Sequence, residues 1–183
     1  MKCLHLILFT CAISSMTSAQ VLFNAIIEED ICQDVTLTLN SSAELSQDEC
    51  LYSIDIDQVN PGMNTLEISS DIPALLHTTT LDMVLAMRAM DEGFESYGQA
   101  LSADFNSDLV ISTDDIINMA RIIVGIDTEI PTKVKIATES QITQPVNSLE
   151  LSSDQTSLTF EEGTIVDGEV NNVFLIIVGD LNN

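Results

Sequence analysis

The sequence predicts an α+β protein in which a central pair of loop-and-helix units is flanked on both sides by short β-strand segments. Three observations lead to this fold class. Apolar and polar side chains alternate before residue 70 and again after residue 131, a pattern typical of half-buried strands. Between residues 71 and 125 the apolar spacing becomes helical. That helical stretch also contains two copies of one pattern, offset by 33 residues.

The chain begins with the layout of a secretory signal peptide. Lys2 precedes an apolar run over residues 4–13, and small residues lead to Ala19, which predicts cleavage after Ala19. A lipoprotein signal using Cys11 is the alternative, although the residues before it are not the small ones expected there. The apolar run is shorter than the ~20 residues needed to cross a bilayer. We therefore expect a secreted or periplasmic protein that does not insert into the membrane after cleavage.

Four segments follow from these patterns: a signal peptide at 1–19, a β-rich segment at 20–70, a helical domain at 71–127 and a second β-rich segment at 128–183. The full chain has a net charge of −24. Without residues 1–19 it keeps all 29 acidic side chains and four basic ones. A charge of this sign repels nucleic acid and anionic membrane surfaces and attracts cations.

Two cysteines remain after cleavage, Cys32 and Cys50. In an exported chain we expect them to form a disulfide, which contributes roughly 3 kcal/mol by the chain-entropy model. Strands are indicated nearby by the alternating segments DVTLTLN and LYSIDID, and later by the runs KVKIA, SLEL, SLTF and NVFLIIV.

The helical segment is an internal duplication. The two copies match in hydroxyl, carboxylate and basic side chains as well as in apolar ones, including the only arginines of the chain. The matched pairs are Thr79 with Ser112, Thr80 with Thr113, Asp82 with Asp115, Met83 with Ile116, and Arg88 with Arg121.

Each copy contains the signals of a helix. Ser112 or Thr113 can cap the second helix, and Gly125 can end it in a left-handed conformation. Two apolar stripes are expected to form the buried seam between the helices. They consist of Met83, Met87 and Met90 in the first helix and Ile116, Ala120, Ile123 and Val124 in the second.

The segment DFNSDLVISTDD, residues 104–115, has the spacing of a calcium loop. Calcium takes six to eight oxygen ligands, which a twelve-residue loop supplies from places one, three, five, seven, nine and twelve. Here those places hold Asp104, Asn106, Asp108, the backbone carbonyl of Val110, Ser112 and Asp115.

The loop departs from the usual pattern at two places. Leu109 stands at the sixth place, where glycine normally adopts a positive φ, and this costs on the order of 1 kcal/mol. Asp115 replaces the longer glutamate of the twelfth place. The strain at Leu109 is expected to weaken calcium binding without abolishing it, and Asp115 is expected to reach the ion differently from a glutamate.

These residues resemble a dockerin domain, the tandem calcium-loop-and-helix module of secreted polysaccharide-degrading systems, over residues 71–125. The chain is also similar to dockerin-like modules in large secreted proteins of Bacteroidota, where elements such as TTLDMVL and a late strand ending in GDLN occur. The resemblance implies calcium-dependent folding and docking onto a cohesin-like or other extracellular protein. It also implies that loop places ten and eleven select the partner; these are Thr80 and Leu81 in one copy and Thr113 and Asp114 in the other.

The first copy of the loop is degenerate. It keeps Asp71, Thr79 and Asp82, but Pro73 and Leu75 occupy the third and fifth places. A side chain without oxygen cannot bind calcium, so we expect one Ca²⁺ site in the chain and a first loop that is empty or very weak.

Two functional classes follow. The first is a secreted calcium-binding module that docks another extracellular protein, with an association to polysaccharide degradation. The alternative is a calcium-braced structural segment of a β-rich secreted or adhesive protein. An enzyme is not expected, because the sequence lacks a nucleophile elbow, a zinc-protease helix motif and a phosphate-binding loop.

Overall fold

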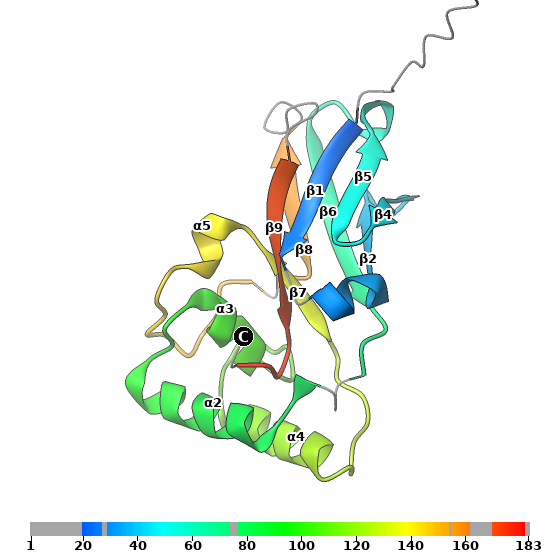
Figure 1. The fold of residues 1–183 in the computed structure, drawn as a ribbon. Helices are drawn as coiled ribbons and strands as arrows, with labels where there is room; N and C mark the ends of the chain where they lie inside the picture. Colours follow the sequence, from blue (N-terminus) through cyan, green and yellow to red (C-terminus); the bar gives the residue numbers. More distant parts are fainter. Residues whose placement is uncertain (1–19, 27–28, 74–76, 154, 162–169, 182–183) are drawn as a thin grey trace, which may run out of the picture.

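A computed structural model describes residues 20–26, 29–73, 77–153, 155–161 and 170–181 (Figure 1). The predicted signal peptide lies outside these residues. Within the described part of the chain, no helix has the length and apolar composition needed to span a bilayer.

The strands form two sheets. The first has the order β4-β5-β1-β9-β7 and the second has the order β3-β2-β6-β8. In the first sheet the strands are β1 (Gln20–Ile26), β4 (Ser46–Asp48), β5 (Leu51–Asp55), β7 (Val134–Ala137) and β9 (Val170–Ile177). In the second they are β2 (Val35–Leu39), β3 (Ala43–Glu44), β6 (Met63–Ser70) and β8 (Ser157–Glu161).

Strands from the two ends of the chain pair directly with each other. β1 runs parallel to β9, with Leu22 opposite Val170, and antiparallel to β5. In the other sheet β8 runs antiparallel to β6, with Leu66 opposite Leu158. The segments before and after the helices therefore build both sheets together.

The two sheets pack face to face around one apolar core (Figure 1). Alternate side chains of each strand supply this core, as in β2, where the odd-numbered positions Val35, Leu37 and Leu39 are buried. Phe23 of one sheet approaches Phe160 of the other, with ring centroids 6.0 Å apart. The alternation read from the sequence thus marks the inner face of a sandwich.

The helices gather at one end of the sandwich, where the described chain also ends (Figure 1). They are α2 (Thr80–Glu92), α3 (Tyr97–Ala103), α4 (Thr113–Ile123) and α5 (Glu139–Ile142), and two 3-10 turns, η1 (Glu29–Asp34) and η2 (Ile56–Gln58), lie among the strands. A second apolar cluster joins α2, α3 and α4 to Ile176 near the end of β9 and to residues that follow that strand.

The predicted arrangement of a central helix pair flanked by short strand segments is wrong. The strands instead form two extended sheets, and four helices cover one end of them. The reason is pairing at long range, because β1 and β9 lie about 150 residues apart in sequence and local periodicity does not reveal their partnership. Of the predicted late strands, residues 148–151 form no strand, although Glu150 makes an isolated bridge to Val110.

The predicted disulfide is confirmed. Cys32 and Cys50 are bonded, with their Cα atoms 5.3 Å apart. Cys32 is buried, and its carbonyl accepts hydrogen bonds from the Tyr52 hydroxyl and from the Gln47 amide. The bond therefore joins η1 to the residue directly before β5.

Candidate functional site

The predicted calcium loop connects α3 to α4, and its backbone makes the expected tight turn. Leu109 has φ of 70° and Ser107 has φ of 58°, both in the left-handed region. The sixth place of the loop thus adopts the positive φ for which glycine is normally chosen. The Leu109 side chain packs against the second apolar cluster, so the leucine contributes burial where glycine contributes none.

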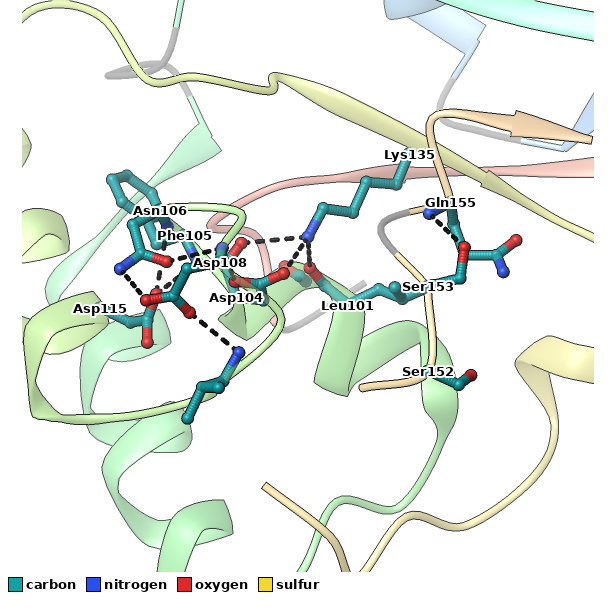
Figure 2. A network of polar contacts seen from close by, with 12 residues as sticks. Leu101, Asp104, Phe105, Asn106, Asp108, Asp115, Lys135, Ser152, Ser153 and Gln155 are labelled. Carbon is teal, nitrogen blue, oxygen red and sulfur yellow. Dashed lines mark hydrogen bonds and ion pairs between the residues drawn. The ribbon is translucent and has the colours of Figure 1, made fainter. Parts of the chain in front are cut away.

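Asp104, in the first place of the loop, is completely buried and paired with a lysine. Its Oδ2 lies 2.9 Å from Nζ of Lys135, which comes from β7 and is equally buried. The same Nζ donates to the carbonyl oxygens of Leu101, at 3.0 Å, and of Asp104, at 3.1 Å. Figure 2 shows the Lys135 side chain reaching from its strand to this cluster of oxygens. The other carboxylate oxygen, Oδ1, accepts from the backbone N–H of Asp108 at 3.1 Å.

Asp115, in the twelfth place, closes the loop through backbone amides. Its Oδ1 accepts from the N–H groups of Phe105, at 2.8 Å, and Asn106, at 3.1 Å. Its Oδ2 accepts from the N–H of Ser112, at 2.8 Å, and from the Ser112 hydroxyl, at 3.4 Å. A carboxylate has about four acceptor positions, so these four donors occupy them all.

Burial raises the pKa of the Asp115 carboxyl above its usual range. The backbone N–H groups of Ser112, Asn106 and Phe105 act in the opposite direction, and the nearby charge of Asp104 raises the pKa further. Loss of hydration outweighs the hydrogen bonds because the side chain is fully enclosed.

The middle of the loop faces solvent. The exposed Asp108 carboxylate accepts from the backbone N–H of Val110 at 2.9 Å and from the Asn106 side-chain amide at 2.9 Å. Val110 is 43% exposed. Ser112 is half-buried and caps α4, since its hydroxyl accepts from the N–H of Asp114 at 3.1 Å. Asp108 and Val110 are therefore the exposed residues among the predicted ligand places, and Asn106 and Ser112 are half-buried.

The loop is also fastened to the β-rich part of the chain. The Ile111 N–H donates to the Leu149 carbonyl at 2.7 Å, and the Leu151 N–H donates to the Leu109 carbonyl at 2.8 Å. Ile111 itself is fully buried. Its inward position agrees with the usual role of the eighth place in a calcium loop.

The residue types and the turn fit calcium, a hard ion that prefers carboxylate, amide and carbonyl oxygens. The carboxylates do not, however, point toward one common position where a metal ion would bind. Among the described residues, no group of three or more His, Cys, Asp or Glu side chains gathers closely enough to hold a metal ion. Asp104 is turned toward Lys135 and Asp115 toward the start of the loop. Calcium would thus use Asn106, Asp108, one oxygen of Asp104 and the Val110 carbonyl, and it would compete for Asp115.

The first copy uses its matching aspartate in the same way. Asp82 is buried, caps α2 through the N–H of Thr79 at 2.8 Å, and accepts from the backbone N–H of Leu181 at 2.9 Å. Pro73, in the third place of that loop, is exposed, and Leu75, in the fifth, lies outside the described residues. Both helices of the repeat begin with a reciprocal capping box, Thr79 with Asp82 and Ser112 with Asp115.

The predicted seam between the helices is partly wrong. In α4 the buried apolar residues are Met119 and Ile122, while Val124 is 68% exposed. In α2 the fully buried apolar residue is Ala86, and Met87 is 51% exposed. Each helix has a buried aspartate near its start, and the residues four and seven positions later lie on the same side of the helix as that aspartate. This side is therefore the buried one. Gly125 follows the end of α4 with φ of 73°, as predicted.

An apolar face is exposed on α2 and α4 as a result. We call it the outer helix face, and it consists of Leu81, Val84 and Met87 on α2, Ile117 on α4 and Val124 at the C-cap of α4, each at least half exposed. The four predicted partner-contact residues, Thr80, Leu81, Thr113 and Asp114, are all exposed at the first turns of these helices.

No family model, curated protein or solved structure matches this chain significantly. The site residue that sequence reasoning missed is Lys135. A lysine at the centre of the strand segment KVKIA was a usable signal, because every residue of β7 is buried and a lysine there needs a buried partner.

Proposed function

We propose that this chain is a secreted calcium-binding module that docks another extracellular protein through the outer helix face. The observation that supports the proposal most is that five apolar side chains, each at least half exposed, lie on α2 and on α4 or its C-cap, and that these two helices contact each other. Scattered exposed apolar residues are ordinary on protein surfaces, whereas a group on one region marks an interaction site. The group begins at the loop places that the dockerin resemblance associates with partner choice.

The loop has a structural part in this function. Its last four residues include the start of α4: Ser112 is the N-cap of that helix, and Asp115, the last residue of the loop, is the other member of its capping box. Calcium at Asn106 and Asp108 would hold the loop against the start of α4 and fix how Ile117 and Val124 are presented. Partner binding is therefore expected to be stronger with calcium than with a chelator.

The partner is expected to be a protein with an apolar patch and basic groups at its edge. The chain carries a net charge of −24, and Asp114 stands exposed at the first turn of α4. This charge disfavours nucleic acid and anionic lipid as ligands. The dockerin resemblance points to a cohesin-like protein and to polysaccharide degradation, in which this chain would connect and not catalyse.

A second candidate function is a calcium-braced structural segment that docks nothing. The observation that favours it is the integration of the helices with the sandwich. β9 continues into residues packed under α2 and α3, where the Gly179 N–H donates to the Ser102 carbonyl at 2.9 Å and the Ser102 hydroxyl donates to the Ile177 carbonyl at 2.9 Å.

The docking proposal is tested by partner capture. The protein without residues 1–19 is immobilised and exposed to the secreted proteins of its source, with calcium or with chelator. We expect one protein to be captured in calcium, and its capture to be lost when Val84→Glu and Ile117→Glu are combined. Met63→Glu is the matched control, because Met63 is 59% exposed and lies on β6 of the sandwich, not on either helix. Capture that survives the double change, or none at all, would favour the structural function.

A further inference from the structure

We propose that Lys135 is the built-in counter-ion of the loop: its ammonium group neutralises Asp104, holds the loop closed without calcium, and leaves the charge that one calcium ion balances. The last part rests on the proposed calcium binding. The first part concerns the folded chain alone.

The ammonium group of Lys135 is surrounded by oxygen atoms that accept hydrogen bonds from it. Nζ has three oxygen acceptors within 3.1 Å, namely Oδ2 of Asp104 and the carbonyls of Leu101 and Asp104. Both charged side chains have no exposed surface. An isolated buried charge is very unfavourable, so removing either of these two groups leaves the other buried without its charged partner.

The acceptors that Lys135 holds come from the end of α3 and the first place of the loop. Leu101 lies within α3, and Asp104 follows the end of that helix. One ammonium group on β7 thereby fixes the helix end, the loop start and the sandwich relative to one another (Figure 2). In a loop that folds only with metal, a bound ion holds such segments together in the same way.

The net charge of the ligand places and Lys135 together indicates how much positive charge a bound ion must supply. Three ligand places carry carboxylates, Asp104, Asp108 and Asp115, and Lys135 supplies one positive charge. The net charge of the ligand set is then −2, which a single calcium ion neutralises. Lys135 also occupies Oδ2 and leaves Oδ1 directed at the loop, where it accepts from the Asp108 N–H. Asp104 is thus arranged to offer calcium one oxygen and not two.

The test is thermal unfolding of the protein without residues 1–19, in chelator and in excess calcium, with Lys135→Met and with Lys133→Met as control. Lys133 is partly exposed and pairs with Glu129 at 3.2 Å. In chelator we expect the wild type to unfold cooperatively and Lys135→Met to unfold about 10 °C lower, since breaking a buried pair leaves an uncompensated charge. Calcium should restore at least half of that loss, and Lys133→Met should behave as the wild type.

A double variant keeps the test decisive if Lys135→Met does not fold. Asp104→Asn combined with Lys135→Met removes both charges, and we expect it to fold in chelator with less than half of the loss of Lys135→Met alone. Equal stability of Lys135→Met and wild type in chelator would overturn the proposal, and so would a double variant as unstable as the single one. If the wild type takes up no calcium by calorimetry, the calcium function fails separately and the chelator results still decide the role of Lys135.

Discussion

The carboxylate of Asp82 accepts a hydrogen bond at 2.9 Å from the backbone N–H of Leu181, which lies 99 residues later in the chain. Asp82 is the repeat partner of Asp115, and both are buried carboxylates that cap a helix and receive a further backbone N–H. In the first copy of the duplication, the twelfth loop place therefore joins α2 to the residues that follow β9.

Replacing Asp82 tests this joint. Asp82→Ala leaves the buried N–H of Leu181 without this acceptor, and it also removes the acceptor of the Thr79 N–H at the start of the helix. We therefore expect a loss of about 2–4 kcal/mol in the free energy of unfolding. Urea unfolding measures the loss. Asp91→Ala is the control, because Asp91 is exposed on the same helix. Equal effects of the two substitutions would show that the Asp82 carboxylate does not hold the joint.

Gly179 tests how closely the same segment packs. It has φ of 92°, and a Cβ there would meet the Thr78 hydroxyl and lie 2.7 Å from Cε2 of Phe105. Gly62 has φ of 96° with no atom within 4 Å of an added Cβ. Gly62→Ala should thus cost only backbone strain, about 1–2 kcal/mol, whereas Gly179→Ala should cost at least about twice as much. Comparable midpoints of thermal unfolding for the two variants would contradict the described packing.

Leu109 separates backbone strain from side-chain burial. Leu109→Gly and Leu109→Ala both remove the packing against the second apolar cluster, but only glycine adopts φ of 70° without cost. We expect the glycine variant to be more stable than the alanine variant by about 1 kcal/mol, with the wild type equal to or above both. Chemical unfolding of the three proteins gives the order. An alanine variant at least as stable as the glycine variant would show that the sixth place is not left-handed.

Tyr52 predicts the behaviour at alkaline pH. Its buried hydroxyl donates to the carbonyls of Cys32, at 3.0 Å, and Val35, at 3.1 Å, and burial raises its pKa from 10.0 to about 12. Below pH 10 the hydroxyl is protonated in both states and its contribution is fully present. Between pH 10 and 12 the unfolded chain loses the proton first, so this contribution to stability is lost as the pH rises.

The stability advantage of wild type over Tyr52→Phe should therefore shrink by about 2 kcal/mol across that interval. Unfolding free energies at a series of pH values measure it. Tyr97→Phe is the control, because Tyr97 is half-buried and its hydroxyl contacts Ser152 and Ser153 at 3.4 and 3.5 Å. The same shrinkage in both variants would assign the effect to something other than Tyr52.

Local patterns predicted the local features of the fold. The alternation at Val35, Leu37 and Leu39 marks β2, and the capping signals at Ser112 and Gly125 mark the start and the end region of α4. The sandwich could not be predicted in this way, because its main contacts join strands from opposite ends of the chain. Local spacing gives the side of each strand that is apolar but not the strand beside it.

The inward faces of the helices were mispredicted for a different reason. Apolar periodicity assumes that the buried face is the most apolar one, and in both helices a buried aspartate shifts that face. The inward direction of Asp115 places Met119 and Ile122 in the core and leaves Ile117 at the surface. The outer helix face is a consequence of this shift, and apolar periodicity alone does not reveal it.

Calcium binding at residues 104–115 is the claim on which the proposed function rests, and a calorimetric calcium titration of the protein without residues 1–19 tests it most directly. We predict one ion per chain. Asp108→Asn should weaken binding at least about tenfold, because Asp108 is an exposed ligand whose loss leaves the buried Asp104–Lys135 pair intact. Asp114→Asn, an exposed acidic residue of the same loop outside the ligand places, should bind as the wild type does. No heat of binding in the wild type, or equal affinity in wild type and Asp108→Asn, would contradict the account.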